Sequence, residues 1–263
     1  MKKKNQILIF NLIVIISLLF LSCEKENDPD FPPISIDSVS IGLYIDNAAW
    51  SGLRTPTLNI VKETGFPYTI ITNDSIINGN LDKYSVLFLT AGRGDRYWEN
   101  LGQKGYDNII NYVRRGGGYI GICGSAHIAC DRQIFWGFSG EPRTYGNYDG
   151  MSIFSGIGEG PIETFAPSYR DENCNIIIVN KTHPVSNNLP DTITYVYDHG
   201  PEFIPYDNEP AIIIGETEKG KHALIIAPEY YQGRIFFTSG HPEMANNEIN
   251  RKLIENAINW CSK

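Results

Sequence analysis

The sequence has little of what metal-binding and nucleic-acid-binding proteins require. Its 22 Lys and Arg residues are outnumbered by 30 Asp and Glu residues, and a formal charge of −8 disfavours nucleic acids as partners. The five cysteines form no paired CxxC pattern and no Walker phosphate loop is present, so neither a zinc site nor a nucleotide cofactor is indicated. The 25 glycines follow no repeat, which excludes collagen-like and low-complexity chains. We expect no metal, no cofactor and no nucleic-acid partner.

The N-terminus carries a long apolar run. Three lysines at positions 2–4 precede an apolar segment over 7–21, which is followed by Ser-Cys with the cysteine at Cys23. This arrangement is typical of a secretory signal and resembles the bacterial lipoprotein signal, in which the cysteine carries lipid. The alternative is a transmembrane anchor, but the run is shorter than the ~20 residues that a span needs. We expect residues 1–22 to be a signal peptide and Cys23 to be lipidated.

This hypothesis places the protein in the bacterial cell envelope, attached to a membrane through its N-terminal lipid on the periplasmic side or at the cell surface. Residues 23–37 are acidic and contain proline, and we expect them to form a tether. Loss of the signal with its three lysines lowers the formal charge of −8 by three, to −11. The remaining length suits one large domain over 38–263.

Strand-like and helix-like segments alternate along this domain. Apolar runs predict strands, and apolar residues at helical spacing predict helices. The expected strands cover 39–45, 68–72, 86–90, 119–122, 176–179, 193–196, 211–214, 223–226 and 235–238, and the expected helices cover 50–64, 106–115, 124–130 and 246–260. Their order predicts a flavodoxin-like three-layer α/β sandwich with a parallel central sheet, which C-terminal hairpins extend. Residues 135–168 lack a period and are expected to form an irregular insertion.

The strand over 119–122 runs directly into a predicted helix, with Cys123 at the junction. A strand-to-helix turn this sharp strains the backbone of the central residue and requires small residues two positions away on either side. Gly121 and Ser125 meet this requirement, although serine is less suitable than glycine. The helix N-terminus would favour the thiolate form of the cysteine. The pattern indicates a cysteine nucleophile, whereas the alternative is a buried structural thiol.

A second motif, Ser-Gly-His-Pro-Glu over 239–243, follows the last predicted strand. A cysteine nucleophile needs a base that accepts its proton, and the base needs an acceptor on its other nitrogen. His241 and Glu243 can supply these two groups on either side of a proline. The motif therefore predicts a base that acts together with Cys123.

The elbow and the His-Pro-Glu motif, in a flavodoxin-like order of elements, resemble the class I glutamine amidotransferase superfamily. Together with Thr-His-Pro-Val over 182–185, they look most like the branch named after the N-terminal domain of biotin-protein ligases. The resemblance implies that Cys123 is the nucleophile, His241 the base and Glu243 the residue that orients the base. It implies no ligase activity, because the catalytic part of the ligase does not fit within this length.

The resemblance also implies an oxyanion hole. The Gly-rich loop over 91–94 would provide the N–H of Gly92, and the residue after the nucleophile would provide the N–H of Gly124. Two features depart from the superfamily: Ser125 stands where glycine is usual, and residues 126–128 lack the glutamine that holds the substrate in glutaminase domains. The second departure argues against glutamine as the substrate but leaves the fold unaffected.

Three further residues are candidates for substrate binding. Arg93 follows the oxyanion loop and could pair with a carboxylate, or it is a solvated loop charge. His127 lies one helical turn after the cysteine, and His199 lies in a Gly-Pro loop that could border the cleft. Tyr148 either lines a pocket or packs within the insertion.

Two functions of different classes remain open at this point. In the first, the protein is a Cys-His-Glu hydrolase or amide transferase that acts on a C–N bond through a thioester. In the second, it is a catalytically inactive lipoprotein that binds a glycan or a peptide with the same fold. The sequence also leaves open whether a disulfide joins a pair such as Cys130 and Cys174.

Overall fold

The computed structural model describes residues 31–137, 146–167, 172–207, 212–245 and 247–263. The chain divides into two compact units, residues 1–32 and residues 33–263, and the second unit holds all the helices and strands described below. The predicted signal peptide, the lipidation site Cys23 and most of the tether lie outside the described residues. The second unit begins before residue 38, because the N–H of Ile34 donates to the carbonyl of Arg115 at 2.8 Å.

The centre of the domain is a ten-stranded sheet whose first part is parallel. Its parallel strands lie in the order β2-β1-β3-β4-β14. Most of these strands are short, continuously buried apolar runs, as expected for strands that helices cover on both faces. Their bounds are β1 (Ile41–Tyr44), β2 (Tyr68–Ile71), β3 (Val86–Leu89), β4 (Gly118–Ile122) and β14 (Gly233–Thr238).

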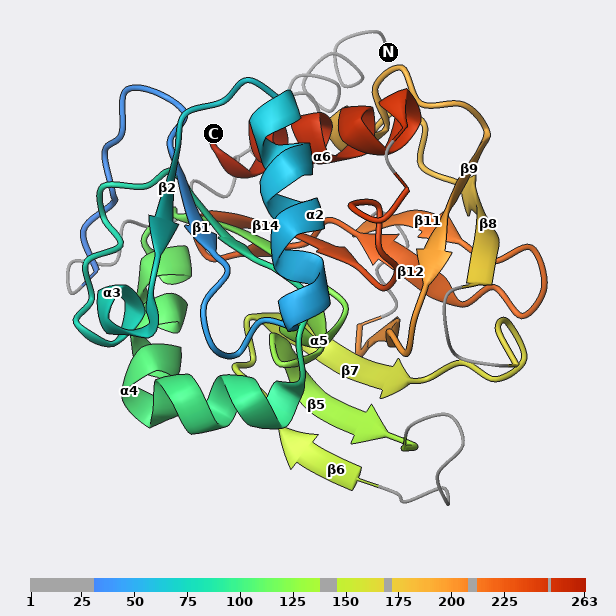
Figure 1. The fold of residues 1–263 in the computed structure, drawn as a ribbon, viewed down its shortest axis with the longest axis horizontal. Helices are drawn as coiled ribbons and strands as arrows, with labels where there is room; N and C mark the ends of the chain where they lie inside the picture. The colour runs from blue at the N-terminus through green and yellow to red at the C-terminus, as the bar shows by residue number, and fades with distance from the viewer. Residues whose placement is uncertain (1–30, 138–145, 168–171, 208–211, 246) are drawn as a thin grey trace, which may run out of the picture. The chain divides into compact units, whose positions relative to one another are not determined.

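An antiparallel part continues the same sheet beyond β14, in the order β12-β11-β8-β9 (Figure 1). Its strands are β8 (Glu172–Ile178), β9 (Thr192–Tyr197), β11 (Ile213–Glu216) and β12 (Ala223–Ile226), and β13 (Glu229–Tyr230) pairs with β14 at the side. These antiparallel pairs confirm the predicted hairpin extension.

Helices cover both faces of the sheet and give three layers. One face packs against α2 and α6, which contribute Ile60, Val61, Leu253 and Ile254 to its core. The other face packs against α4, which contributes Ile109, Tyr112 and Val113. The helices are α2 (Ser51–Glu63), α3 (Asn73–Ile77), α4 (Gly94–Arg114), α5 (Gly124–His127) and α6 (Glu248–Cys261), with a 3-10 turn, η1, over Pro184–Ser186.

Two helices differ from their predicted lengths. Helix α4 begins twelve residues before the predicted start at 106, because Gly102 adopts φ 56° and ψ −172° and joins two helical segments across a kink. Helix α5 ends at His127 instead of residue 130, where a strand begins. None of the helices in the described part of the chain is both long and apolar enough to span a bilayer.

The expectation of an irregular segment over 135–168 was wrong where the structure describes it. A four-stranded sheet in the order β10-β7-β5-β6 uses this region, and its strands are β5 (Cys130–Phe135), β6 (Gly146–Asp149), β7 (Phe154–Gly160) and β10 (Glu202–Pro205). In β7, glycine takes every second position, at Gly156, Gly158 and Gly160. A Cβ at any of these three glycines would lie within 2.7 Å of another atom, so on this face the strand carries no side chain beyond Phe154 and shows no apolar period.

The four cysteines in the described part of the chain are all free. Cys130, Cys174 and Cys261 are buried, and Cys123 is partly exposed. A disulfide between Cys130 and Cys174 is therefore not formed.

Candidate active site

Cys123 lies at the sharp turn between β4 and α5 with φ 52° and ψ −114°. A non-glycine residue with this backbone conformation is strained. Its neighbours show why the turn needs small residues: a Cβ on Gly121 would lie 2.9 Å from the backbone of Ala126, and a Cβ on Gly124 would lie 1.7 Å from the carbonyl oxygen of Gly92. The structure therefore has the elbow geometry that the sequence predicts at Cys123.

Ser125 takes the place of the usual glycine by using its hydroxyl group. The Oγ atom accepts a hydrogen bond from the N–H of Ile122 at 2.8 Å and donates to the carbonyl of Leu89 at 2.8 Å. These bonds join the C-terminal ends of β3 and β4 beneath the elbow. Ser125 is fully buried, so the hydroxyl satisfies backbone groups that would otherwise lack partners.

His241 and Glu243 follow β14 and lie beside the elbow. The Nδ1–H of His241 donates to Oε1 of Glu243 at 2.8 Å, and both side chains are almost fully buried. The backbone N–H of His241 donates to the carbonyl of Val196 at 2.7 Å, which ties this segment to β9. With Nδ1 bonded to the carboxylate, Nε2 is the ring atom left for the thiol of Cys123, and both Nε2 and the thiol lie 3.4 Å from the carbonyl oxygen of Asp198.

Burial alone would lower the pKa of His241. The negative charge of Glu243 and the contact with Cys123 outweigh this effect and raise the pKa well above its ordinary value. The second oxygen of Glu243, Oε2, is buried and has no hydrogen-bond partner among the described residues, so the imidazolium of His241 is the main compensation for this charge. The arrangement therefore favours a protonated His241 next to Cys123.

The carbonyl oxygen of Asp198 lies next to both groups. It accepts a hydrogen bond from Sγ of Cys123 at 3.4 Å and lies 3.4 Å from Nε2 of His241. The loop that carries it is held in place: the hydroxyl of Tyr197 donates to the carbonyl of Gly200 at 2.6 Å, and a Cβ on Gly200 would lie 1.9 Å from the carbonyl oxygen of Ser239. No residue pattern signals this role, because a backbone carbonyl makes the contact.

Gly92 and Gly124, the two residues predicted for an oxyanion hole, lie against each other. A Cβ on Gly92 would lie 2.3 Å from the carbonyl oxygen of Ala48, and the Gly124 backbone touches the carbonyl of Gly92. Both residues line the same cavity as Cys123 and His241. The structure brings these four predicted residues together at one end of the parallel strands.

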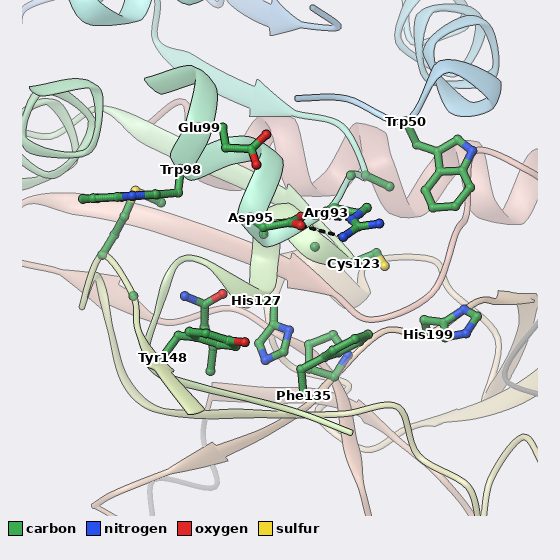
Figure 2. Close-up of a pocket in the computed structure, with 18 of the residues that line it drawn as sticks. Trp50, Arg93, Asp95, Trp98, Glu99, Cys123, His127, Phe135, Tyr148 and His199 are labelled. Atoms are coloured by element: carbon green, nitrogen blue, oxygen red, sulfur yellow. Dashed lines mark hydrogen bonds and ion pairs between the residues drawn. The ribbon is translucent and has the colours of Figure 1, made fainter. Parts of the chain in front are cut away.

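The cavity beside Cys123 has a volume of about 1170 Å³. Figure 2 shows Trp98 and Tyr148 at one end, Trp50 and His199 at the other, and Cys123 between them. Trp50, Trp98 and Tyr148 expose between 50% and 61% of their surface. Further apolar lining comes from Leu53, Tyr106, Ile110, Phe135, Met151, Pro201 and Met244.

The three predicted substrate-binding residues all line this cavity, and each already has a partner. The Nε and NH2 groups of Arg93 donate to the two carboxylate oxygens of Asp95 at 3.0 and 2.6 Å. His199 has a positive φ of 57°, and its Nδ1 is hydrogen-bonded to the carboxylate of Asp198. Nε2 of His127 is bonded to the carbonyl of Gly158 at 2.7 Å.

His127 is neutral at physiological pH. Burial lowers its pKa to about 4, although the bond to the Gly158 carbonyl opposes this shift. Since a neutral ring carries one proton, Nε2–H is the donor and Nδ1 is left as an acceptor. His127 can therefore accept a hydrogen bond but cannot serve as a cation for a carboxylate substrate.

The exposed aromatic residues at the cavity, Trp50 and Trp98, were not predicted. The sequence indicates their position only weakly, because each tryptophan lies at or near the start of a helix, where a buried core residue is an equally good interpretation. Within the described residues, no group of three or more His, Cys, Asp or Glu side chains is placed to hold a metal ion.

Comparisons with known proteins agree with this fold. The family described as "Biotin-protein ligase, N terminal" matches residues 56–260. An uncharacterized protein from Chlamydia muridarum (strain MoPn / Nigg) is 27% identical over 133 residues, which cover 48% of this chain and 51% of that protein. The match thus spans about half the length of this curated relative.

Solved structures share the fold at low sequence identity. A protein described as a GMP synthase subunit, from Thermoplasma acidophilum, has a TM-score of 0.55 and 17% identity, with 86% of this chain and 96% of that chain covered. A chain of PurLQS from Thermotoga maritima has a TM-score of 0.57 and 14% identity, with 85% and 99% covered. The chain therefore has a class I glutamine amidotransferase-like fold and belongs to the biotin-protein ligase N-terminal family.

Proposed function

We propose that this protein is a cysteine-dependent hydrolase or transferase that acts on an amide C–N bond through a thioester. The observation that carries this proposal is the strained Cys123 at the N-terminus of α5, whose thiol lies against the same Asp198 carbonyl as a His241 that Glu243 holds in place. Strained backbone is retained where a function requires it. A cysteine, a base and an orienting carboxylate are the groups that covalent acyl transfer needs.

The proposed reaction begins with attack of the Cys123 thiolate on the amide carbonyl carbon. A C–S bond forms, and the electron pair of the C=O bond moves to oxygen, which we expect to accept hydrogen bonds from the N–H groups of Gly92 and Gly124, two residues of the cavity lining. As the C–N bond breaks, the leaving nitrogen takes the proton of the His241 imidazolium. Water or another acceptor then attacks the thioester, His241 takes the proton of this nucleophile, and the C–S bond breaks to restore the thiolate.

The raised pKa of His241 suits this sequence of steps. A protonated ring next to the sulfur stabilises the thiolate and provides the proton for the leaving amine. The carbonyl of Asp198, at 3.4 Å from Nε2, can accept a hydrogen bond from the imidazolium and keep the ring oriented when the sulfur is engaged with substrate. Glu243 holds the opposite nitrogen throughout.

Alkylation of Cys123 tests the proposal. We expect iodoacetamide to label Cys123 at neutral pH faster than it labels the same cysteine in the urea-unfolded chain, and His241→Gln to abolish this difference. The buried cysteines Cys130, Cys174 and Cys261 serve as internal references in the same peptide map. Equal rates in the folded and unfolded chains would leave a binding protein without catalysis as the remaining function.

We also propose that the domain is tethered to a membrane of the bacterial envelope through lipid on Cys23. The support is the lysine-rich start, the apolar run and the Ser-Cys junction. Cys23→Ser should release the protein from the membrane fraction and abolish incorporation of radiolabelled fatty acid. Ser22→Ala, which keeps a small residue before the cysteine, is the matched control and should stay lipidated. A Cys23→Ser protein that remains with the membrane would point to a transmembrane anchor.

A further inference from the structure

The size of the cavity limits what its substrate can be. Pockets for small ligands usually enclose about 300–1,000 Å³, whereas the cavity around Cys123 encloses about 1170 Å³. A single amino-acid amide would fill a small part of this space and leave most of the lining in contact with water. The volume therefore fits a substrate of several residues.

Apolar surface extends away from Cys123 in two directions. On one side are Trp98 and Tyr148, and on the other side is Trp50 (Figure 2). Trp98 is held against Tyr106 in an edge-to-face contact with ring centroids 5.3 Å apart, so its exposed surface is preorganised. Exposed aromatic residues grouped around one cavity mark a binding surface. Their distribution indicates contacts on both the acyl side and the leaving-group side of the bond.

The acidic and arginine side chains along the cavity each have a partner of opposite charge or a histidine partner. Arg93 pairs with Asp95 through two hydrogen bonds, and Asp198 pairs with His199. Two further carboxylates of the lining, Glu99 and Asp149, pair with Arg96 and Arg132. Aromatic and aliphatic side chains make up the largest share of the remaining lining, which also includes the amides of Gln103 and Gln133. A glycan requires many free donors and acceptors for its hydroxyl groups, and a free amino acid requires partners for two charges. An apolar, uncharged chain makes fewer such demands.

We propose that the amide attacked by Cys123 belongs to an extended peptide segment, with apolar side chains on both sides of the bond in contact with the aromatic residues of the cavity. This inference rests on the proposed function and adds its substrate class. Trp98 and Tyr148 would select the residues on one side, and Trp50 the residues on the other.

Electrophilic peptides test the substrate class. The acyl-side probe is acetyl-Phe-Leu-Ala chloromethyl ketone, and its polar match is acetyl-Ser-Gly-Ala chloromethyl ketone. The leaving-group-side pair is N-iodoacetyl-Leu-Phe-amide with N-iodoacetyl-Ser-Gly-amide, and N-iodoacetyl-glucosamine represents a sugar. For each probe, the rate of Cys123 modification is divided by the rate at which the same probe reacts with glutathione. This ratio removes differences in intrinsic reactivity between the probes.

We expect each apolar probe to react at least about tenfold faster than its polar match, a factor equivalent to about 1.4 kcal/mol. Trp98→Ala and Trp50→Ala should each reduce this preference for one of the two probes. Tyr231→Ala is the matched control, because Tyr231 exposes 53% of its surface and does not line the cavity. It should leave all ratios unchanged.

The outcomes separate this inference from the proposed function. If iodoacetamide labels Cys123 rapidly and in a His241-dependent way while both peptide pairs show no preference, the nucleophile stands and the peptide substrate is refuted. A preference for the glucosamine probe over the apolar peptides would also refute it. If iodoacetamide labels Cys123 in the folded protein no faster than it labels the same cysteine in the unfolded chain, the proposed function itself fails.

Discussion

Replacement of Cys123 by glycine should leave the protein more stable than replacement by alanine, although both changes remove the proposed nucleophile. Cys123 has φ 52° and ψ −114°, a conformation that glycine adopts freely. A non-glycine residue held there costs about 1–3 kcal/mol. Glycine loses about 0.5–1 kcal/mol through the greater freedom of the unfolded chain. The balance is a gain of about 1 kcal/mol for Cys123→Gly over Cys123→Ala, which keeps the strain and also lacks the thiol.

Urea and thermal unfolding of the two variants measure this difference. For a chain of this size, about 1 kcal/mol corresponds to a rise in Tm of about 2–4 °C. Lys221, which has φ 54° and does not line the cavity, provides a control. The difference in stability between Lys221→Gly and Lys221→Ala measures the gain from glycine at a positive φ elsewhere in the chain. If Cys123→Gly is no more stable than Cys123→Ala, the elbow stores no strain, and the structural basis for a nucleophile is lost.

Three further predictions concern the surroundings of the elbow. Gly124→Ala should destabilise the fold by about 3 kcal/mol in urea unfolding, the upper end of the usual cost of overpacking, because its Cβ would lie 1.7 Å from the carbonyl oxygen of Gly92. Gly52→Ala in α2, with 3.6 Å of clearance, should be tolerated. Between pH 6.5 and pH 4 the unfolded chain takes up a proton on His127 and the folded chain does not, so the free energy of unfolding should decrease by up to about 3 kcal/mol as the pH is lowered through this window. His127→Gln should remove that part of the pH dependence. If the pH profile of stability is the same in His127→Gln, the ring is protonated in the folded state. Glu243→Gln removes the charge that raises the pKa of His241, so the pH at which His241 loses its proton should fall. Alkylation of Cys123 at neutral pH should then be slower. An alkylation rate equal to that of the unmodified protein would contradict the role of Glu243.

The parallel part of the fold was predictable because its signals are local and strong. Buried runs such as Val86–Leu89 read as strands without any knowledge of their partners, and the Gly-x-Cys junction identified the elbow. The second sheet was missed because β7 carries glycine, instead of apolar side chains, on alternate positions. In that strand the close approach of neighbouring atoms, which sequence does not report, determines the structure.

The site was predictable to the extent that side chains make it. The sequence singles out Cys123, His241 and Glu243 because an elbow needs small neighbours and a cysteine nucleophile needs a base with an acceptor, and the structure brings the segments of all three side by side. The Asp198 carbonyl and the extent of the cavity depend on how a loop and α4 pack, and backbone contacts leave no mark on residue type. Arg93 illustrates the reverse case: its charge suggested a carboxylate ligand, but the nearby Asp95 occupies the guanidinium.

The place of β14 in the sheet has a consequence for how the protein is made. This strand comes late in the sequence, yet it pairs with β4 in the interior of the sheet, so Cys123 does not lie beside His241 until β14 has been inserted. Pairings between distant segments form slowly and leave strand edges open while they do. A chain in which β14 is not yet paired therefore presents the open edge of β4 to chaperones and proteases. The step that closes this edge also brings His241 to the thiol, so the proposed nucleophile and its proposed base meet only once this pairing has formed.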